Sequence, residues 1–172
     1  SLYRYGNNDY AHVLSQVKGM PDADRKRIAG TLLSTLKPYD IPLRELEYSQ
    51  VMFDLTLDQG AYFELKRHRM MTQTPQQLTT HLGYCIPSMI VRAGLEQHYR
   101  KAMTTARETF EALEKVNPNI ASYVVPNAYN RRVLLSMNLR TARHLILLRT
   151  SDRAHFSIRR AAACMGEKII QS

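Results

Sequence analysis

The fold is constrained most strongly by a stretch from about Glu47 to Asp58 in which apolar residues recur at alternate positions. Four residues set this pattern: Val51, Phe53, Leu55 and Leu57. A repeat of two residues is typical of a β-strand that buries one face. A shorter alternation from about Arg132 to Met137 predicts a second strand, and residues 122–125 predict a third. The chain is therefore expected to contain a sheet.

Helical patterns fill much of the remaining N-terminal half. Asp9 is a suitable N-cap for a helix that runs to about Lys18, and Pro21 opens a second helix. Residues 61–65 predict a short helix that ends at the basic stretch Arg67-His68-Arg69. Residues 70–87 contain two prolines and a glycine, so we expect them to form a loop.

Three further helices are expected after Ser88. The first would run for about 28 residues and bury an apolar stripe. Its stripe consists of Ala102, Ala106, Phe110 and Leu113. The second would begin at Asn138 and end at Arg149, and the third would run from about Asp152 to the end of the chain. Mixed helices and strands without a repeat or a linker predict one α+β domain over residues 1–172.

The positive charge is distributed unevenly along the chain. Its 24 Lys and Arg residues outnumber 15 Asp and Glu, a net charge of +9, and residues 131–160 hold eight arginines against one acidic residue, Asp152. Arginine binds phosphate or carboxylate through a planar pair of donors, so this segment suggests a shaped anion site. A solvated basic face and a nucleic-acid-binding surface are the two alternative interpretations.

Several other classes of protein lack their signatures here. No run of 18 apolar residues is present, so a membrane span is not expected. Cys85 and Cys164 form neither a CxxC pair nor a disulfide framework, which favours a reducing compartment and predicts a cytoplasmic location. Neither a glycine-rich phosphate motif nor a metal-binding histidine spacing occurs, so no metal is assigned.

The helix expected from Asn138 carries the strongest candidate for a binding site. Asn138 and Arg140 lie at its start, where free backbone N–H groups favour an anion, and His144 follows one turn later. The arrangement suits a phosphate group or the pyrimidine edge of a flavin. A purely structural interpretation is open as well, with Asn138 as a helix cap, Arg140 and Arg143 as exposed charges, and His68 as a polar residue at a helix end.

Several motifs, in this order, resemble those of the flavin-dependent thymidylate synthases. The resemblance covers most of the chain from about Arg25. It is carried by Leu46-Glu47-Tyr48, Arg67-His68-Arg69, Tyr123-Val-Val-Pro126, the stretch from Asn138 to Arg149, and Ala154-His155-Phe156.

This resemblance implies an α+β fold in which an antiparallel sheet packs with long helices. It also implies a homotetramer with active sites shared between subunits, which binds FAD and methylates dUMP to dTMP with methylenetetrahydrofolate and NADPH. Contacts to FAD are implied for Arg67, His68, Arg69, Asn138, Arg140 and His144. Arg149 would take a catalytic role, engaging the uracil ring and helping it ionise, which suits a fixed guanidinium in a water-poor site.

The nucleotide-binding part of the family motif is largely replaced in this chain. Where the family has Ser, Asn, Ser and Arg, the sequence has Thr72, Thr74, Gln77 and Thr79. Ser122 replaces an arginine that grips the dUMP phosphate, Glu64 replaces a glutamine, and Tyr48 replaces a histidine. The loss of two arginines could cost several kcal/mol of nucleotide affinity, at about 1.5–3 kcal/mol for each charged hydrogen bond.

Three functional hypotheses follow. The first is a thymidylate-synthase-type flavoenzyme domain that uses dUMP or another nucleotide. The second is a non-catalytic partner domain that keeps the fold and the FAD contacts. The third, a nucleic-acid-binding module, is disfavoured because the chain has no Trp and no RNP or zinc-finger pattern.

The run from Arg67 to Gln73 and the run from Leu78 to Tyr84 resemble a divergent branch of the family. In that branch two such domains share one chain, and this sequence is similar to the second. We therefore expect that it could be the C-terminal part of a longer protein, paired with a second like domain or assembled as a homo-oligomer.

Overall fold

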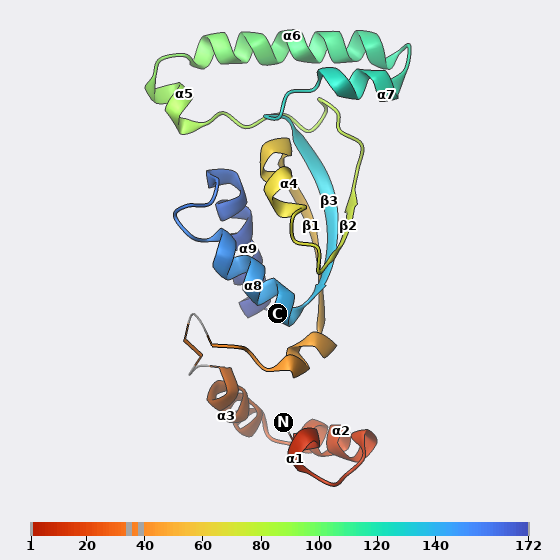
Figure 1. Ribbon diagram of the computed structural model, residues 1–172, viewed down its shortest axis with the longest axis vertical. Helices are drawn as coiled ribbons and strands as arrows, with labels where there is room; N and C mark the ends of the chain where they lie inside the picture. Colours follow the sequence, from red (N-terminus) through yellow and green to blue (C-terminus); the bar gives the residue numbers. More distant parts are fainter. Residues whose placement is uncertain (1, 34–35, 38–39, 172) are drawn as a thin grey trace. The chain divides into compact units, whose positions relative to one another are not determined.

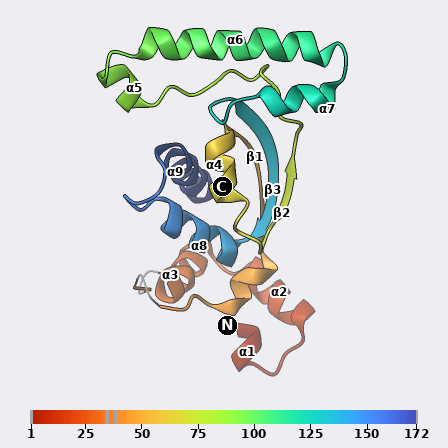
Figure 2. The same ribbon diagram turned by 45° about the horizontal axis from the view of Figure 1, so that its top comes forward.

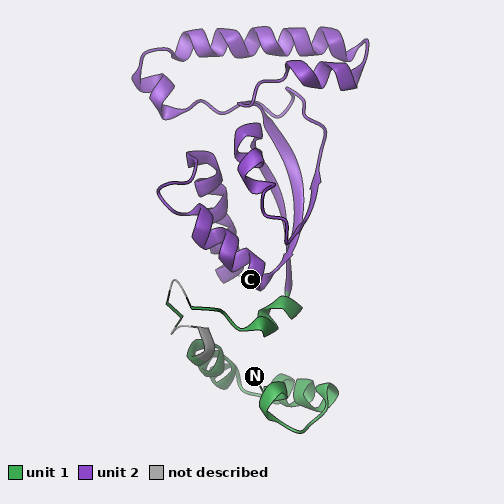
Figure 3. Cartoon of the chain, in the orientation of Figure 1, with its two compact units in different colours: residues 1–49 green, residues 50–172 purple. Residues whose placement is uncertain are grey.

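The computed structural model describes residues 2–33, 36–37 and 40–171 (Figure 1). Contacts divide the chain into two units, Ser1–Ser49 and Gln50–Ser172 (Figure 3). Every residue for which a cofactor or catalytic role is expected lies in the second, larger unit.

The first unit is helical. It contains α1 (Leu2–Tyr5), α2 (Tyr10–Gly19), α3 (Asp22–Leu33) and a 3₁₀ helix, η1 (Arg44–Tyr48). The Asp9 side chain caps α2 by accepting a hydrogen bond from the backbone N–H of His12 at 2.8 Å. The two helices predicted from Asp9 and Pro21 are therefore confirmed.

An antiparallel sheet of three strands organises the second unit. Its strands are β1 (Gln50–Asp58), β2 (Thr72–Pro75) and β3 (Asn130–Asn138), in the order β1-β3-β2. Gln50 pairs with Asn138 and Asp58 with Asn130, so β1 and β3 are matched along their whole length. The sheet that the alternating patterns predict is confirmed, although β1 begins at Gln50 because residues 44–48 form η1.

Three helices cover one face of this sheet: α4 (Gln59–Leu65), α8 (Leu139–Arg149) and α9 (Phe156–Gln171) (Figure 2). The core between the two layers is apolar, with Val133, Leu135 and Leu65 fully buried. Alternate side chains of β3 supply this core, as the period of two predicts. An α+β architecture with an antiparallel sheet packed by long helices is thus confirmed.

A second apolar cluster lies beyond the end of the sheet. It joins α6 (Glu96–Glu114) and α7 (Pro118–Ala121) to the start of β3. Phe110 is buried there, and the hydroxyl of the buried Tyr129 donates a hydrogen bond to the Met103 carbonyl at 2.6 Å. The hydrogen bond satisfies a polar group that burial would otherwise leave without a partner.

The predicted loop over residues 70–87 is wrong in part, because Thr72–Pro75 forms β2. These residues show no apolar alternation, so the period of two does not reveal them. The strand exists because β3 offers a free edge, and Thr72 pairs there with Ser136. Pro75, which lacks an N–H donor, is tolerated at the end of an edge strand.

The single long helix predicted after Ser88 is also wrong. The chain forms α5 (Ser88–Arg92), then a break, then α6. Gly94 adopts φ +69° at the break, a left-handed conformation that glycine reaches at little cost and that ends a helix. On α6 the buried residues are Met103 and Phe110, so Phe110 of the predicted stripe is confirmed, whereas the predicted Ala102 is exposed.

Two other predictions fail near helix boundaries. Residues 122–124 form a 3₁₀ helix, η2 (Ser122–Val124), instead of a strand, because it continues the helical turn of α7 that Asn117 and Pro118 start. The last helix, α9, begins at Phe156 rather than near Asp152. Asp152 lies in the preceding turn and pairs with Arg159 at 3.1 Å.

Among the residues that the structure describes, no helix combines the length and the apolar character needed to cross a bilayer.

Candidate functional site

Helix α8 follows β3 directly, without a loop. The Asn138 side chain caps it by accepting a hydrogen bond from the backbone N–H of Thr141 at 2.8 Å. Ala142 and Leu145 are fully buried against the sheet and fix the rotation of the helix. His144 lies on the exposed side of α8, whereas Arg149, seven residues after Ala142 and four after Leu145, lies at the end of the side that packs against the rest of the unit.

Helix α4 is fixed in a similar way after β1. The buried Asp58 side chain accepts a hydrogen bond from the backbone N–H of Ala61 at 2.8 Å, and Ala61 and Leu65 are fully buried. The turn that follows places His68, whose backbone carbonyl accepts a hydrogen bond from the Gln73 side chain at 3.1 Å. The backbone N–H of His68 also donates to the Leu65 carbonyl at 3.0 Å, so the middle residue of the Arg67-His68-Arg69 stretch is tied to α4 and to β2.

The two helices meet at Arg149. Its Nε donates to Nε2 of His68 at 2.9 Å, its Nη1 pairs with Oε2 of Glu64 at 2.9 Å, and its Nη2 donates to the Glu64 carbonyl at 3.1 Å. The rings of His68 and His144 lie 6.3 Å apart between centroids, nearly edge to face. We refer to Glu64, His68, His144 and Arg149 as the Arg149 cluster.

The Arg149 cluster is only partly open to solvent. The Arg149 side chain is 17% exposed and that of Glu64 is 29% exposed. Burial lowers the pKa of His68, and the nearby Arg149 and His144 lower it further. The imidazole of His68 is therefore neutral at pH 7, which leaves Nε2 able to accept the hydrogen bond from Arg149.

The structure brings together three of the seven residues for which roles are expected: His68, His144 and Arg149. Asn138 and Arg140 lie at the other end of α8, which is about 16 Å long at 1.5 Å per residue. Arg67 and Arg69 flank His68 and are exposed. The expected site residues thus form a tight group at one end and an extended row along α8.

The positions that replace the Ser, Asn and Arg residues of the family motif carry neutral side chains. The Gln77 amide donates to the Pro118 carbonyl at 3.2 Å, and the Thr79 hydroxyl accepts from the backbone N–H of His81 at 3.3 Å. The Ser122 hydroxyl donates to the Asn119 carbonyl at 2.7 Å. Thr72 and Thr74 belong to β2. The bonds of Thr79 and Ser122 are local, whereas that of Gln77 reaches the first residue of α7.

Glu64 is the member of the Arg149 cluster to which the sequence alone assigned no role. It stands out in the sequence only as an acidic residue in place of a glutamine. Its partner Arg149 lies 85 residues away, so the pairing depends on the packing of α4 and α8 against one sheet. The only local signal is that Glu64 and His68 are four residues apart at the end of a helix.

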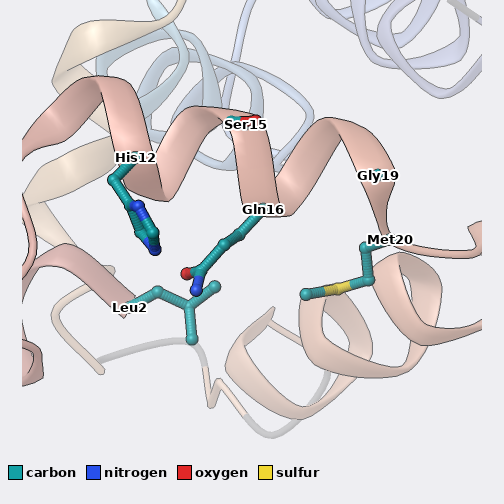
Figure 4. A pocket seen from close by; sticks show the side chains of 6 residues that line it. All are labelled: Leu2, His12, Ser15, Gln16, Gly19 and Met20. Carbon is teal, nitrogen blue, oxygen red and sulfur yellow. The ribbon is translucent and has the colours of Figure 1, made fainter.

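A separate cavity of about 540 Å³ lies within the first unit (Figure 4). The side chains of His12 and Gln16 point into it, together with those of Leu2 and Met20. It contains none of the residues for which roles are expected. Among the described residues, no three His, Cys, Asp or Glu side chains are grouped as a metal ion would need.

Comparison with known proteins identifies relatives along almost the whole chain. A sequence profile for a family described as thymidylate synthase complementing protein matches residues 9–172. A UPF0159 protein of Chlamydia muridarum is 37% identical over 173 residues, which cover 99% of this chain and 32% of that protein. UPF0159 protein Ta1429 of Thermoplasma acidophilum is 29% identical over 164 residues, which cover 94% of this chain and 33% of that protein.

A more distant relative carries a functional name. The flavin-dependent thymidylate synthase of Geobacter sulfurreducens is 28% identical over 130 residues, which cover 70% of this chain and 56% of that enzyme. The chain spans about a third of the length of the UPF0159 relatives that it matches. With its profile match over residues 9–172, the chain belongs to the thymidylate synthase complementing protein family, to which the resemblance in its motifs also points.

Proposed function

We propose that this chain is a flavin-binding domain of the thymidylate synthase type, with FAD held along α8 and the Arg67-His68-Arg69 stretch. The observation that carries the proposal is the hydrogen bond between Arg149 and His68, which joins two stretches 81 residues apart. Separate motifs can form one binding site only if the folded chain brings them together, and this hydrogen bond joins two of them. Packing that served stability alone would not need a half-buried guanidinium at this point.

The donor groups suit the two kinds of polar group in FAD. Arg67 and Arg69 are exposed cations, and the positive end of the helix dipole at the start of α8 favours a phosphate. At the other end of the helix, the Arg149 cluster offers donors and acceptors to a heteroaromatic ring edge. When bound, FAD would supply the transfer of hydride equivalents.

In this proposal the residues of the chain have distinct tasks. Arg149 donates hydrogen bonds to a carbonyl oxygen of a bound ring and stabilises negative charge on it. His68 is a positioning residue, because its neutral Nε2 accepts from Arg149 Nε and fixes the plane of the guanidinium. Asn138 holds the start of α8, and Arg140 and His144 present polar groups along it. The full reaction would methylate dUMP with methylenetetrahydrofolate and NADPH.

A second candidate function is favoured by the residues that replace the nucleotide-binding positions of the family motif. Gln77, Thr79 and Ser122 are neutral and bond to nearby backbone groups. A chain with these residues would bind FAD and a like domain, in a homotetramer or with another half of a longer protein, while the partner holds the nucleotide. This non-catalytic partner domain shares the flavin site of the first proposal.

Titration with FAD tests the part that both candidates share. We expect saturable binding, followed by flavin absorbance and fluorescence, that weakens about tenfold or more in Arg67→Ala and in Arg140→Ala, since each loses a charged hydrogen bond. Arg107→Ala is the matched control, because Arg107 is an exposed arginine on α6. Equal affinity in all four proteins would contradict the assignment.

A second assay separates the two candidates. Reduced flavin bound to the chain would be oxidised in the presence of dUMP and methylenetetrahydrofolate if the domain catalyses the reaction by itself. Oxidation at the same rate with and without dUMP would favour the partner domain.

A further inference from the structure

The guanidinium of Arg149 is already bound to a carboxylate of its own chain. All three of its nitrogens have partners, two of them on Glu64 and one on His68. Glu64 reaches it from the last turn of α4, whose position is fixed by the buried Leu65. The positive charge in the Arg149 cluster is therefore balanced before any ligand arrives.

This pairing differs from an ordinary surface ion pair. The two side chains are 17% and 29% exposed, so water screens them less than it screens exposed pairs such as Arg107 and Glu111. Glu64 also lies on a fixed helix, which gives its carboxylate a high effective concentration beside Arg149. An anionic ligand group would have to displace Glu64 or bind next to its negative charge.

A neutral ligand group can use both charges at once. Arg149 has five N–H donors, and its described bonds use three of them. The Glu64 carboxylate has acceptor positions besides the one that Arg149 takes. A ring edge with an N–H next to a carbonyl would donate to Glu64 and accept from Arg149.

We propose that Glu64 determines the charge of the ligand group that the Arg149 cluster accepts: a neutral edge with an N–H beside a carbonyl, in preference to its deprotonated form. This inference rests on the proposed function, because flavin and uracil rings both carry such an edge. A carboxylate beside the ring N–H raises the pKa of that group and opposes its ionisation. Glu64 thus acts against the charge stabilisation that Arg149 alone would provide.

Binding of dUMP and 5-fluoro-dUMP tests the proposal. The two nucleotides share their sugar and phosphate, so their ratio of affinities reports on the ring alone. Fluorine withdraws electrons and lowers the pKa of the ring N–H, so 5-fluoro-dUMP ionises at lower pH. The ratio of the two dissociation constants would be measured by calorimetry at two pH values, one mildly acidic and one mildly alkaline, with the full chain.

In the unmodified chain we expect 5-fluoro-dUMP to lose affinity relative to dUMP as the pH rises. In Glu64→Gln this loss should shrink or reverse, shifting the alkaline ratio by about tenfold, which corresponds to about 1.4 kcal/mol. Glu96→Gln, which removes the same charge from an exposed pair with Arg100 on α6, should behave like the unmodified chain. Glu64→Asp keeps the carboxylate and should retain the original preference.

An unchanged ratio in Glu64→Gln would overturn the inference, as would an equal shift in Glu64→Asp or no binding of either nucleotide by any variant. FAD titration of the same samples separates this result from the proposed function. FAD binding with an unchanged ratio refutes the role of Glu64 alone. Absence of FAD binding refutes the proposed function itself.

Discussion

The Arg149 cluster and the segment from Thr72 to Thr79 use polar groups in opposite ways. In the cluster, charged side chains from α4 and α8 bond to each other across more than 80 residues of sequence. In the segment, the Thr79 hydroxyl bonds to the backbone two residues away, and the Gln77 amide bonds to one backbone carbonyl. The segment and His68 belong to the family motif that begins at Arg67, whereas His144 and Arg149 belong to the one that begins at Asn138.

The difference shows that the Arg149 cluster depends on the precise positions of two helices, whereas the segment from Thr72 to Thr79 does not. Long-range bonds between charged groups need both helices at fixed positions, and the buried Leu65 and Leu145 provide them. The bond of Thr79 needs only a local turn, and the exposed Gln77 amide makes a single bond to the Pro118 carbonyl, 41 residues away. The cluster should therefore be sensitive to substitution, whereas the segment should tolerate it, and the following experiments test that contrast in order of expected effect.

The largest effect is expected for Arg149→Ala. The substitution leaves the half-buried Glu64 without its cation and His68 without its donor, so the free energy of unfolding should fall by about 2–3 kcal/mol. Urea denaturation would measure it. The matched control is Arg107→Ala, where loss of an exposed pair should cost no more than about 0.5 kcal/mol. Equal losses in the two variants would show that the Arg149 cluster is an ordinary surface feature.

Tighter binding of dUMP is expected when arginine is introduced at Thr79 and Ser122, where the family motif has arginine. The double variant Thr79→Arg and Ser122→Arg should bind dUMP about tenfold more tightly than the unmodified chain, since each arginine offers a charged hydrogen bond to the phosphate. Calorimetry would give the two affinities. Thr105→Arg with Thr109→Arg adds the same charge on α6 and serves as control. A similar gain in this control would mean that net charge alone is responsible.

A pH-dependent effect is expected from His68. Its pKa is lower in the folded chain than the ordinary value of 6.5, because burial and the charge of Arg149 disfavour the imidazolium. The unfolded chain therefore takes up this proton first as the pH falls. The stability contribution is complete above pH 6.5 and is lost as the pH falls through the folded-state pKa.

Glutamine at this position separates His68 from the other titrating groups. His68→Gln can still accept the hydrogen bond from Arg149 but does not titrate, so its free energy of unfolding should fall less steeply below pH 6.5. Chemical denaturation at a series of pH values would compare the two proteins. Parallel curves would mean that His68 makes no contribution to the acid sensitivity.

The smallest effect is expected for Gln77→Ala. This change removes one hydrogen bond from an exposed side chain to the Pro118 carbonyl, so the free energy of unfolding should change by no more than about 0.5 kcal/mol. FAD affinity should stay as it is. A loss as large as that of Arg149→Ala would contradict the contrast between the two regions.

The parts of the fold that the sequence predicted are those with a local pattern. Apolar alternation marked β1 and β3, and the cap at Asn138 marked the start of α8. By contrast, β2 depends on the free edge of β3 and has no apolar pattern of its own. The break before α6 depends on the conformation of Gly94, which helical periodicity does not encode.

The candidate site divides in the same way. Motif spacing selected His68, His144 and Arg149, and the structure brings these three together. Motif spacing could not indicate that Glu64 takes two of the hydrogen bonds of Arg149, because this depends on the packing of α4 beside α8. The roles of all six residues expected to bind FAD, and the catalytic role of Arg149, stay predictions.

The direct junction between β3 and α8 has a consequence for how the length of this chain can vary. Strand β3 is paired on both edges and passes into α8 at Asn138 without a loop. One inserted residue at this junction would turn α8 by about 100° and carry His144 and Arg149 away from His68. The irregular segment between β2 and α5 has no such coupling, so insertions and deletions should accumulate there and be excluded at Asn138.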